Sequence, residues 1–115
     1  MTNVLGGKLK VCGLDLLTGY SRNGFCNVDK YDRGTHIVCA IVTNNFLKFT
    51  YSKGNDLITP RYGFKGLKHG DRWCLCVLRW IEAHENGVAP LVDLESTDYN
   101  VLKYVELDTL RKYSI

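Results

Sequence analysis

The most strongly patterned stretch of the chain is residues 70–87 (GDRWCLCVLRWIEAHENG), which contains both tryptophans. Residues 72–78 alternate well enough for a strand, whereas the apolar positions over 77–86 recur at helical spacing. We predict a strand to about residue 77, followed by a helix that ends at Gly87, because glycine is common just past the last helical residue. One long helix beginning at Asp71 is the alternative.

A second strand-and-helix unit is predicted earlier in the chain. Residues 36–42 (HIVCAIV) form a continuous apolar, β-branched run, which is typical of a strand buried on both faces. Thr43 can cap the helix that follows over 44–53, because its hydroxyl can accept from an unpaired backbone N–H. Gly54 is well placed to end that helix.

The rest of the chain predicts shorter elements and two long loops. Turn residues dominate 13–31 and 55–69, and loops of such length commonly bind a ligand or wrap a core. The other predicted elements are a strand within 4–12, a strand over 89–94 that begins near Pro90, a helix from Ser96 or Thr97 to Tyr104, and a helix from about Asp108.

This order of elements predicts the α+β class. We expect residues 1–115 to form a single domain, a two-layer sandwich with a small mixed sheet, short helices and long loops. Apolar residues make up 45% of the 115 residues, which is enough for a sizeable core and argues against disorder.

Charge and hydropathy restrict the class of partner. The formal net charge is only +3, and the chain has no run of five basic residues, so a nucleic-acid partner is not expected. A small anionic molecule is compatible with this charge. No stretch approaches the roughly 20 apolar residues that span a bilayer, and the first residues lack the apolar centre of a signal peptide. We therefore expect a cytoplasmic protein with no membrane partner.

The cysteines are odd in number, five in all, so they cannot all pair within one chain. In a reducing cytosol the simplest interpretation is free, buried thiols. A zinc site is the alternative, because Cys74 and Cys76 form a C-x-C pair and His36 and Cys39 form an H-x2-C pair. Apolar neighbours favour buried thiols, so no metal and no cofactor is predicted.

A cysteine nucleophile is a further hypothesis. Cys26 lies in a loop near Arg22, and Cys39 lies three residues from His36, which could act as a base. Residues three apart on a regular strand face opposite sides, which weakens the second pairing. We favour a structural, hydrogen-bonded role for His36 at the end of its strand.

Charged residues in loops and at the ends of elements form the candidate binding site. Arg72 lies beside the tryptophan-rich core and must pair with an acidic group or stack on a ring. One alternative is an internal pair with Asp56 or Asp71. The other is an arginine-lined pocket for an anionic ligand, in which Trp73, Tyr62 or Phe64 supplies a stacking face.

Several segments resemble a known bacterial family. The segments CGLDLLTGYSRNGFCN, GTHIVCAIVTNNFLKF, KGNDLITPR, GLKHGDRWCLCVLRWIEA and GVAPLVDLEST, in this order, resemble the family called domain of unknown function 2237. The resemblance covers nearly the whole chain and implies a small α+β fold, but no activity. Where this chain has Thr97-Asp98, the family usually has Thr-His. The resemblance implies a bacterial or phage protein. If the family uses that histidine in catalysis, we expect this member to bind its ligand without turnover, as a virus-borne copy that sequesters it would.

Our leading hypothesis is a binding protein for a small anionic, nucleotide-derived metabolite. A small enzyme, hydrolase-like and using cysteine or carboxylate chemistry, is the first alternative. A structural or protein-interaction module is the second alternative. A further copy of the chain, in a homo-oligomer, is kept as an alternative partner. The expected ligand-binding residues are Arg22, Asn55, Asp56, Thr59, Arg61, Asp71, Arg72, Trp73, Thr97 and Asp98, and the catalytic candidates are Cys26, Cys39 and His36.

Overall fold

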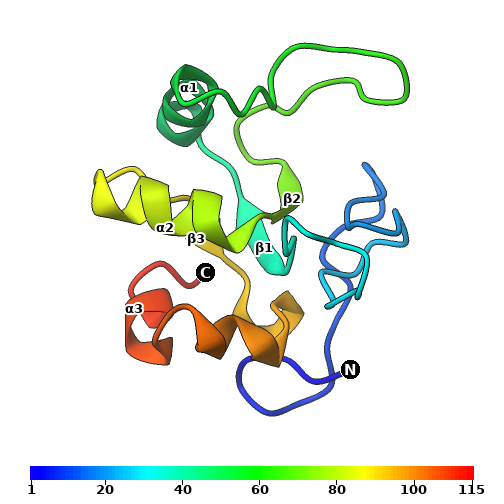
Figure 1. Cartoon of the computed structure of the whole chain (residues 1–115), viewed down its shortest axis with the longest axis vertical. Coiled ribbons are helices and arrows are strands. Elements are labelled where there is room, and N and C mark those ends of the chain that lie inside the picture. Colours follow the sequence, from blue (N-terminus) through cyan, green and yellow to red (C-terminus); the bar gives the residue numbers. More distant parts are fainter.

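The computed structural model describes all of residues 1–115 and centres on a small antiparallel sheet (Figure 1). Its strands are β1 (Val38–Ile41), β2 (Arg72–Leu75) and β3 (Leu91–Val92), in the order β2-β1-β3. Both strand pairings are antiparallel. The α+β class is confirmed, but the expected mixed sheet is wrong in that detail: parallel pairing is limited to isolated bridges, such as Cys26 with Thr97.

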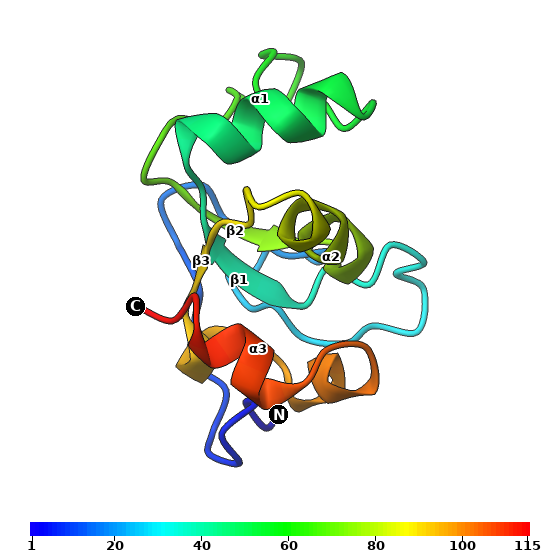
Figure 2. The same ribbon diagram turned by 90° about the vertical axis from the view of Figure 1, so that its left-hand side faces the viewer.

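The helices gather on one side of the sheet, and the N-terminal segment covers the other (Figures 1 and 2). Helix α1 (Asn44–Ser52) contacts α2 (Val77–Glu85), whereas α3 (Leu107–Arg111) and the 3-10 turns η1 (Leu94–Ser96) and η2 (Tyr99–Lys103) lie at the C-terminal end of the fold. The longest helices have nine residues, and none is long and apolar enough to cross a bilayer.

The two strongest local predictions are confirmed. Thr43 caps α1 by accepting a hydrogen bond from the Phe46 amide at 3.2 Å, and Gly54 follows that helix with a φ of 90°. The change from strand to helix in the central stretch falls at Cys76, the N-cap residue of α2. Gly87 follows α2 with a φ of 75°, a conformation that glycine adopts at little cost.

Two weaker predictions are wrong. The segment 4–12 forms no strand and makes only isolated bridges such as Thr2 with Lys8, because turns at its Gly-Gly break lead the backbone away from any ladder. The predicted cap at Ser96 or Thr97 is displaced to Asp98, whose carboxylate accepts from the Asn100 amide at 2.8 Å and begins the turn η2. The 3-10 turns replace the single helix expected there.

Alternation along the strands separates two buried clusters. Val38, Ala40 and Leu75 belong to a main core of 19 buried residues, which also holds Trp80 and is shared with the helices. Cys39 and Cys74 face each other across the ladder, and they pack with Cys12 and Cys26 in a separate cluster. Because successive side chains point to opposite faces of a sheet, one face carries the main core and the other carries the cysteines.

The N-terminal segment, residues 1–37, has no helix or strand and is held by turns and side-chain bonds. Its Thr18 hydroxyl accepts from the amide of Cys74 at 2.6 Å, on the edge strand β2. The amide of Cys12 donates to the Gly24 carbonyl at 2.7 Å. Gly24 has a φ of 91°, and a Cβ there would lie 2.8 Å from the Gly13 carbonyl oxygen, so glycine is required.

Candidate functional site

Two neighbouring pockets flank the edge strand β2 and share Arg22 and Trp73. We call the larger one, of about 670 Å³, the arginine pocket, and the smaller, of about 320 Å³, the thiol pocket. The arginine pocket is lined by Asp15, Leu16, Leu17, Arg22, Pro60, Arg61, Gly63, Phe64, Lys65 and Trp73. The thiol pocket is lined by Gly19, Tyr20, Arg22, His36, Asn55, Leu57, Trp73, Cys74, Leu75 and Cys76.

Two guanidinium groups and two aromatic rings in a row of contacts form one wall of the arginine pocket. The Arg22 guanidinium lies 5.0 Å from the centre of the Trp73 ring. Phe64 meets the same tryptophan edge-on at 5.4 Å, and Arg61 lies 4.8 Å from the centre of the Phe64 ring. Such cation–π and edge-to-face contacts fix the positions of the guanidinium groups and the rings, and they leave the guanidinium N–H groups available to a ligand.

The two arginines keep most of their hydrogen-bonding capacity. Arg22 is exposed and its side chain makes no hydrogen bond or ion pair. Arg61 donates only to the carbonyls of Thr59 and Asp56, at 3.1 and 2.8 Å, and forms no ion pair. Lys65 adds a third positive charge to the lining, against the single carboxylate of Asp15. The pocket is therefore electropositive and rich in unused donors.

The backbone around this pocket is conformationally strained. Arg22 has a φ of 57° and Leu17 a φ of 41°, and both residues line the pocket. Side chains other than glycine, asparagine and aspartate rarely adopt this left-handed conformation. Strained backbone concentrates at ligand-binding sites, because other structure must hold it in place.

The thiol pocket contains an oriented histidine and the one free cysteine. His36 Nδ1 lies 2.7 Å from a carboxylate oxygen of Asp32, which is buried and also accepts from the Gly34 and His36 amides. An ionised carboxylate on Nδ1 selects the tautomer with the proton on Nδ1, so Nε2 is left as an acceptor without a partner. Cys76 lies at the start of α2 and lines the same pocket.

The predicted residues around 55–61 divide between the pockets and a turn. Asn55 lines the thiol pocket, although its amide nitrogen also donates to Thr50 at 3.0 Å. The carboxylate of Asp56 accepts from the Ile58 and Thr59 amides, both at 2.9 Å. A side-chain hydrogen bond from Thr59 and these amides hold the pKa of Asp56 below its ordinary value. Asp56 and Thr59 thus shape the loop that carries Arg61.

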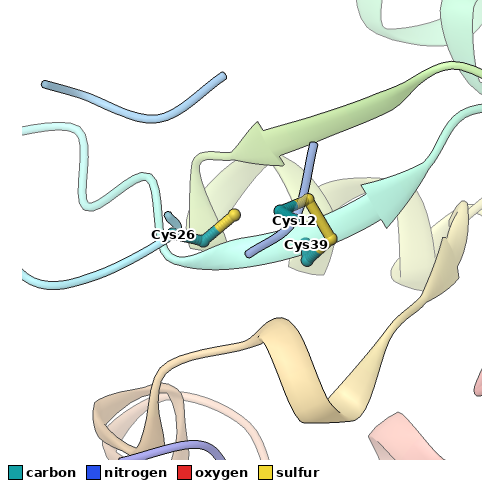
Figure 3. A group of neighbouring side chains, drawn as sticks. All are labelled: Cys12, Cys26 and Cys39. Carbon is teal, nitrogen blue, oxygen red and sulfur yellow. A yellow bond between two sulfur atoms is a disulfide. The ribbon is translucent and has the colours of Figure 1, made fainter. Parts of the chain in front are cut away.

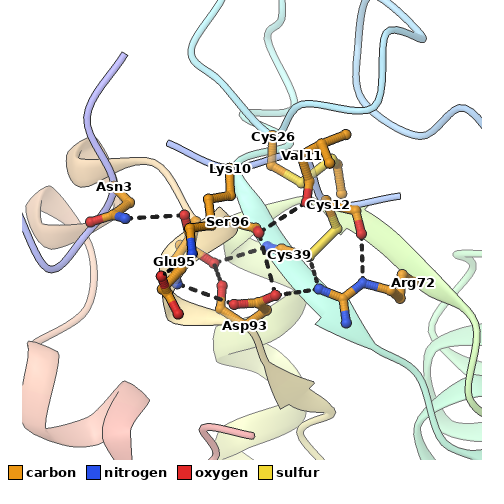
Figure 4. A network of polar contacts seen from close by, with 12 residues as sticks. Asn3, Lys10, Val11, Cys12, Cys26, Cys39, Arg72, Asp93, Glu95 and Ser96 are labelled. Carbon is orange, nitrogen blue, oxygen red and sulfur yellow. Dashed lines mark hydrogen bonds and ion pairs between the residues drawn. A yellow bond between two sulfur atoms is a disulfide. The ribbon is translucent and has the colours of Figure 1, made fainter. Parts of the chain in front are cut away.

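Arg72 has an internal partner, and the partner is neither of the two predicted. Its guanidinium pairs with Asp93 and also donates to the Cys12 carbonyl (Figure 4). The predicted pairing with Asp56 or Asp71 is wrong, because β3 brings Asp93 next to β1 and only the folded sheet makes that approach.

Three further predicted binding residues are satisfied within the fold. Asp71 accepts from the Lys68 amide at 2.7 Å, in the turn that leads into β2. The Thr97 hydroxyl accepts from the Cys39 amide and donates to the Asp93 carbonyl. Asp98 is buried and accepts from the amides of Asn100 and Val28. Of the ten predicted residues, the structure brings Arg22, Asn55, Arg61 and Trp73 to the pockets.

Four of the five cysteines are paired as disulfides, Cys12 with Cys39 and Cys26 with Cys74. The prediction that all five are free thiols is wrong, because the fold brings distant cysteines together on one face of the sheet. Cys26 and Cys39 are fully buried and bonded, so neither offers a nucleophile in this state. Disulfides are typical of oxidising compartments, and the cytoplasmic location stays a prediction.

Sequence reasoning missed that His36 and Cys76 line one pocket. Cys76 was weighed only as a metal ligand, although its position before a helix could have marked it. Asp32 and His36 are four residues apart, and no element was predicted that would bring their side chains together. Tyr62, considered as a stacking ring, is fully exposed, and Phe64 takes that role.

Comparison with known families gives one match and no functional precedent. None of the curated proteins compared with the chain matches it. The model of the family DUF2237, described as an uncharacterized protein conserved in bacteria, matches residues 2–114. The match includes both pockets and all five cysteines, and it confirms the resemblance drawn from the sequence. The chain therefore belongs to the DUF2237 family of uncharacterized bacterial proteins.

Proposed function

We propose that the protein binds a small anionic molecule that carries a flat ring, of the nucleotide-derived class, in the arginine pocket. The carrying observation is the guanidinium of Arg22, which lies over Trp73 at 5.0 Å with no hydrogen-bond or ion-pair partner. A phosphate or carboxylate would complete its unused donors, because a guanidinium matches either anion with two parallel bonds.

The neighbouring groups support the same ligand class. Arg61 and Lys65 add positive charge to the lining of the pocket, and Phe64 offers an apolar ring between Arg61 and Trp73. A volume of about 670 Å³ lies within the range that small-molecule sites occupy. Asn55, in the adjoining thiol pocket, would accept or donate to hydroxyl groups of a ligand that extends across Arg22.

Isothermal titration tests this proposal with three probes: a nucleoside monophosphate, the corresponding nucleoside and inorganic phosphate. We expect the monophosphate to bind most tightly, because it alone supplies both charge and ring. The substitution Arg22→Gln should weaken its binding about tenfold or more, by loss of a charged hydrogen bond. Arg111→Gln, on α3, removes the same charge away from the pockets and should leave binding unchanged.

Two results would contradict the proposal. One is the absence of binding by all three probes to protein whose fold is intact. The other is an equal loss of affinity in the Arg22→Gln and Arg111→Gln variants, which would indicate a general charge effect rather than a site.

A second candidate function, nucleophilic thiol chemistry, is favoured by the contents of the thiol pocket. His36 Nε2 is free to accept the Cys76 proton, and Asp32 would stabilise the resulting imidazolium. The backbone keeps these residues close, because the Val77 amide donates to the Thr35 carbonyl at 3.1 Å. This candidate replaces Cys26 and Cys39, which the disulfides occupy.

Labelling of the folded protein with iodoacetamide tests the second candidate. Cys76 is the one free thiol, so the rate at pH 7 reports on it alone. We expect His36→Gln to slow labelling about tenfold, since the base is lost, and Asp32→Asn to shift the pH profile of the rate. Equal rates in the parent protein and in His36→Gln would remove the thiol candidate and leave the binding proposal intact.

A further inference from the structure

The four disulfide-bonded cysteines lie close enough together to form one metal site. The sulfur atoms of Cys12, Cys26 and Cys39 all lie within 4.8 Å of one another. Figure 3 shows Cys26 beside the bond that joins Cys12 to Cys39. Cys74 is bonded to Cys26 and faces Cys39 directly in the ladder. All four sulfurs therefore gather at one place on the sheet.

This separation is near what tetrahedral zinc requires. Zinc bound by four thiolates has Zn–S bonds of about 2.3 Å, which places the sulfur atoms roughly 3.8 Å apart. After reduction, the sulfurs of each former disulfide, 2.03 and 2.00 Å apart when bonded, must separate by about 1.8 Å. The Cys26 sulfur must approach those of Cys12 and Cys39 by no more than about 1 Å. Rotation about the side-chain bonds of cysteine is sufficient for such a shift.

The surroundings suit a buried site with negative charge. The four residues have exposed fractions of 2% or less and pack together as one cluster. The Arg72 guanidinium lies beside the cluster, with its Nη2 atom 3.7 Å from the Cys39 sulfur (Figure 4). A positive group at this distance offsets part of the charge that four thiolates leave around one zinc ion, as outer hydrogen bonds do at metal sites.

The cysteine cluster links the N-terminal segment to the sheet. Residues 1–37 contain no helix or strand, and the cluster ties two of their turns, at Cys12 and Cys26, to β1 and β2. Reduction would open both links and leave four thiols facing one another in a confined space. Four such thiols, held by an otherwise folded sheet, are a pre-arranged zinc site.

We propose that the cysteine cluster is a redox-dependent zinc site: two disulfides when oxidised, and one Zn²⁺ held by Cys12, Cys26, Cys39 and Cys74 when reduced. Each disulfide takes two electrons and two protons from a dithiol, which itself becomes a disulfide. Zinc then displaces the protons of the four thiols. Cys74 lines the thiol pocket, which gives a small dithiol a route to the first bond. This proposal does not depend on the ligand of the arginine pocket.

Native mass spectrometry and optical spectroscopy test the proposal on the full chain. The protein is reduced with a phosphine under anaerobic conditions and then titrated with Zn²⁺ or, as a coloured substitute, Co²⁺. We expect one metal ion per chain and the absorption of tetrahedral, thiolate-bound Co²⁺. The oxidised protein should bind neither ion at this site.

Single cysteine substitutions distinguish zinc binding by the cysteine cluster from zinc binding by the one remaining thiol, Cys76. Cys12→Ser and Cys74→Ser should each lower zinc affinity of the reduced protein about 100-fold or more, because each removes one of four ligands. Cys76→Ser is the matched control and should keep full affinity, since Cys76 lies outside the cluster. Loss of zinc binding in Cys76→Ser, or its retention in Cys12→Ser and Cys74→Ser, would overturn the assignment.

Hydrogen exchange covers the case in which reduction unfolds the chain. We expect reduction to raise exchange over residues 1–37 and equimolar zinc to restore its protection. Reduced protein that takes up no zinc, or whose N-terminal segment stays unprotected after zinc is added, would overturn the proposal, whether or not residues 38–115 remain folded.

Discussion

Residues 38–115 contain every helix and strand of the protein, whereas residues 1–37 contain none. Of the 19 residues in the main core, only Val4 and Ile37 come from the first segment. The first segment is instead held by two disulfides, by hydrogen bonds from a few side chains, and by backbone hydrogen bonds such as that from the Val4 amide to the Thr97 carbonyl at 2.9 Å. One small fold thus combines two modes of stabilisation. Apolar burial stabilises the regular region, residues 38–115, whereas covalent and polar links stabilise the irregular region, residues 1–37.

This division also places the candidate chemistry. Arg22 and His36 come from the irregular segment, whereas Trp73 and Cys76 come from the edge strand and the helix that follows it. Both pockets therefore lie where the two regions meet. Loops placed on a rigid sheet are a common setting for binding sites, because the loop can vary while the sheet fixes its position.

The substitution Trp80→Ala is expected to destabilise the regular region. Trp80 is fully buried in α2, packs against His84 and Tyr113, and donates to the Pro90 carbonyl. Truncation of such a side chain leaves a cavity and should lower the free energy of unfolding by about 3–5 kcal/mol, measured by chemical denaturation. Leu78→Ala, at an exposed position of the same helix, is the control and should change it little. Equal losses would refute a core that depends on Trp80.

Removal of one disulfide is expected to loosen the irregular region selectively. The double substitution Cys26→Ser and Cys74→Ser opens a link across 48 residues and should cost about 2–4 kcal/mol in unfolding free energy. Hydrogen exchange should rise mainly over residues 1–37, while α1 and α2 keep their protection. Uniform loss of protection along the chain would contradict the separation of the two regions.

We expect one buried polar side chain of the irregular region to contribute more to the free energy of unfolding than the helix cap of α1 does in the regular region. Asn3 is buried and bonds the carbonyls of Lys8 and Glu95 and the amides of Leu5 and Gly7. Asn3→Ala should lower the unfolding free energy by about 1–3 kcal/mol, because buried backbone groups lose their partner. Thr43→Ala, which removes the α1 cap, should cost about 1 kcal/mol. Thermal denaturation of both variants shows which one is destabilised more. A larger loss in Thr43→Ala than in Asn3→Ala would contradict the dependence of the irregular region on single polar side chains.

The smallest expected effect concerns the loop that carries Arg61. Hydrogen bonds from Thr59 lower the pKa of Asp56, so its ionised form favours the folded state. That contribution is fully present above the ordinary carboxyl pKa of about 3.9 and is lost as the pH falls through the lower folded value. An NMR titration of the Asp56 carboxyl should give a midpoint below the ordinary value. A midpoint at or above it would show that the turn is not formed in solution.

Local patterns were sufficient for much of the regular region. The β-branched run before Thr43 predicted β1, and the cap and Gly54 predicted the limits of α1. The same reasoning placed the change from strand to helix near residue 77, and α2 begins at Val77 with Cys76 as its N-cap residue. These signals depend on neighbours within a few residues, and periodicity and capping are properties of such short segments.

The candidate site was only partly predictable for the same reason. Arg22, Arg61 and Trp73 were recognised as polar or stacking groups, but their meeting in one pocket depends on two loops folding onto an edge strand. The pairing of Arg72 with Asp93 likewise needs strand β3 beside β1. Neither contact leaves a periodic trace in the sequence, because the partners are far apart along the chain.

The sequence by itself determined the α+β class, the family and the principal strand-and-helix units, since apolar periodicity, capping residues and short motifs are written locally. The tertiary structure alone decided which cysteines pair, which arginines keep free donors, and that Asp32, His36 and Cys76 share a pocket. These depend on contacts between segments far apart along the chain, such as Cys26 and Cys74 with a separation of 48 residues. Only the closing of the sheet and the docking of the N-terminal segment bring such segments together.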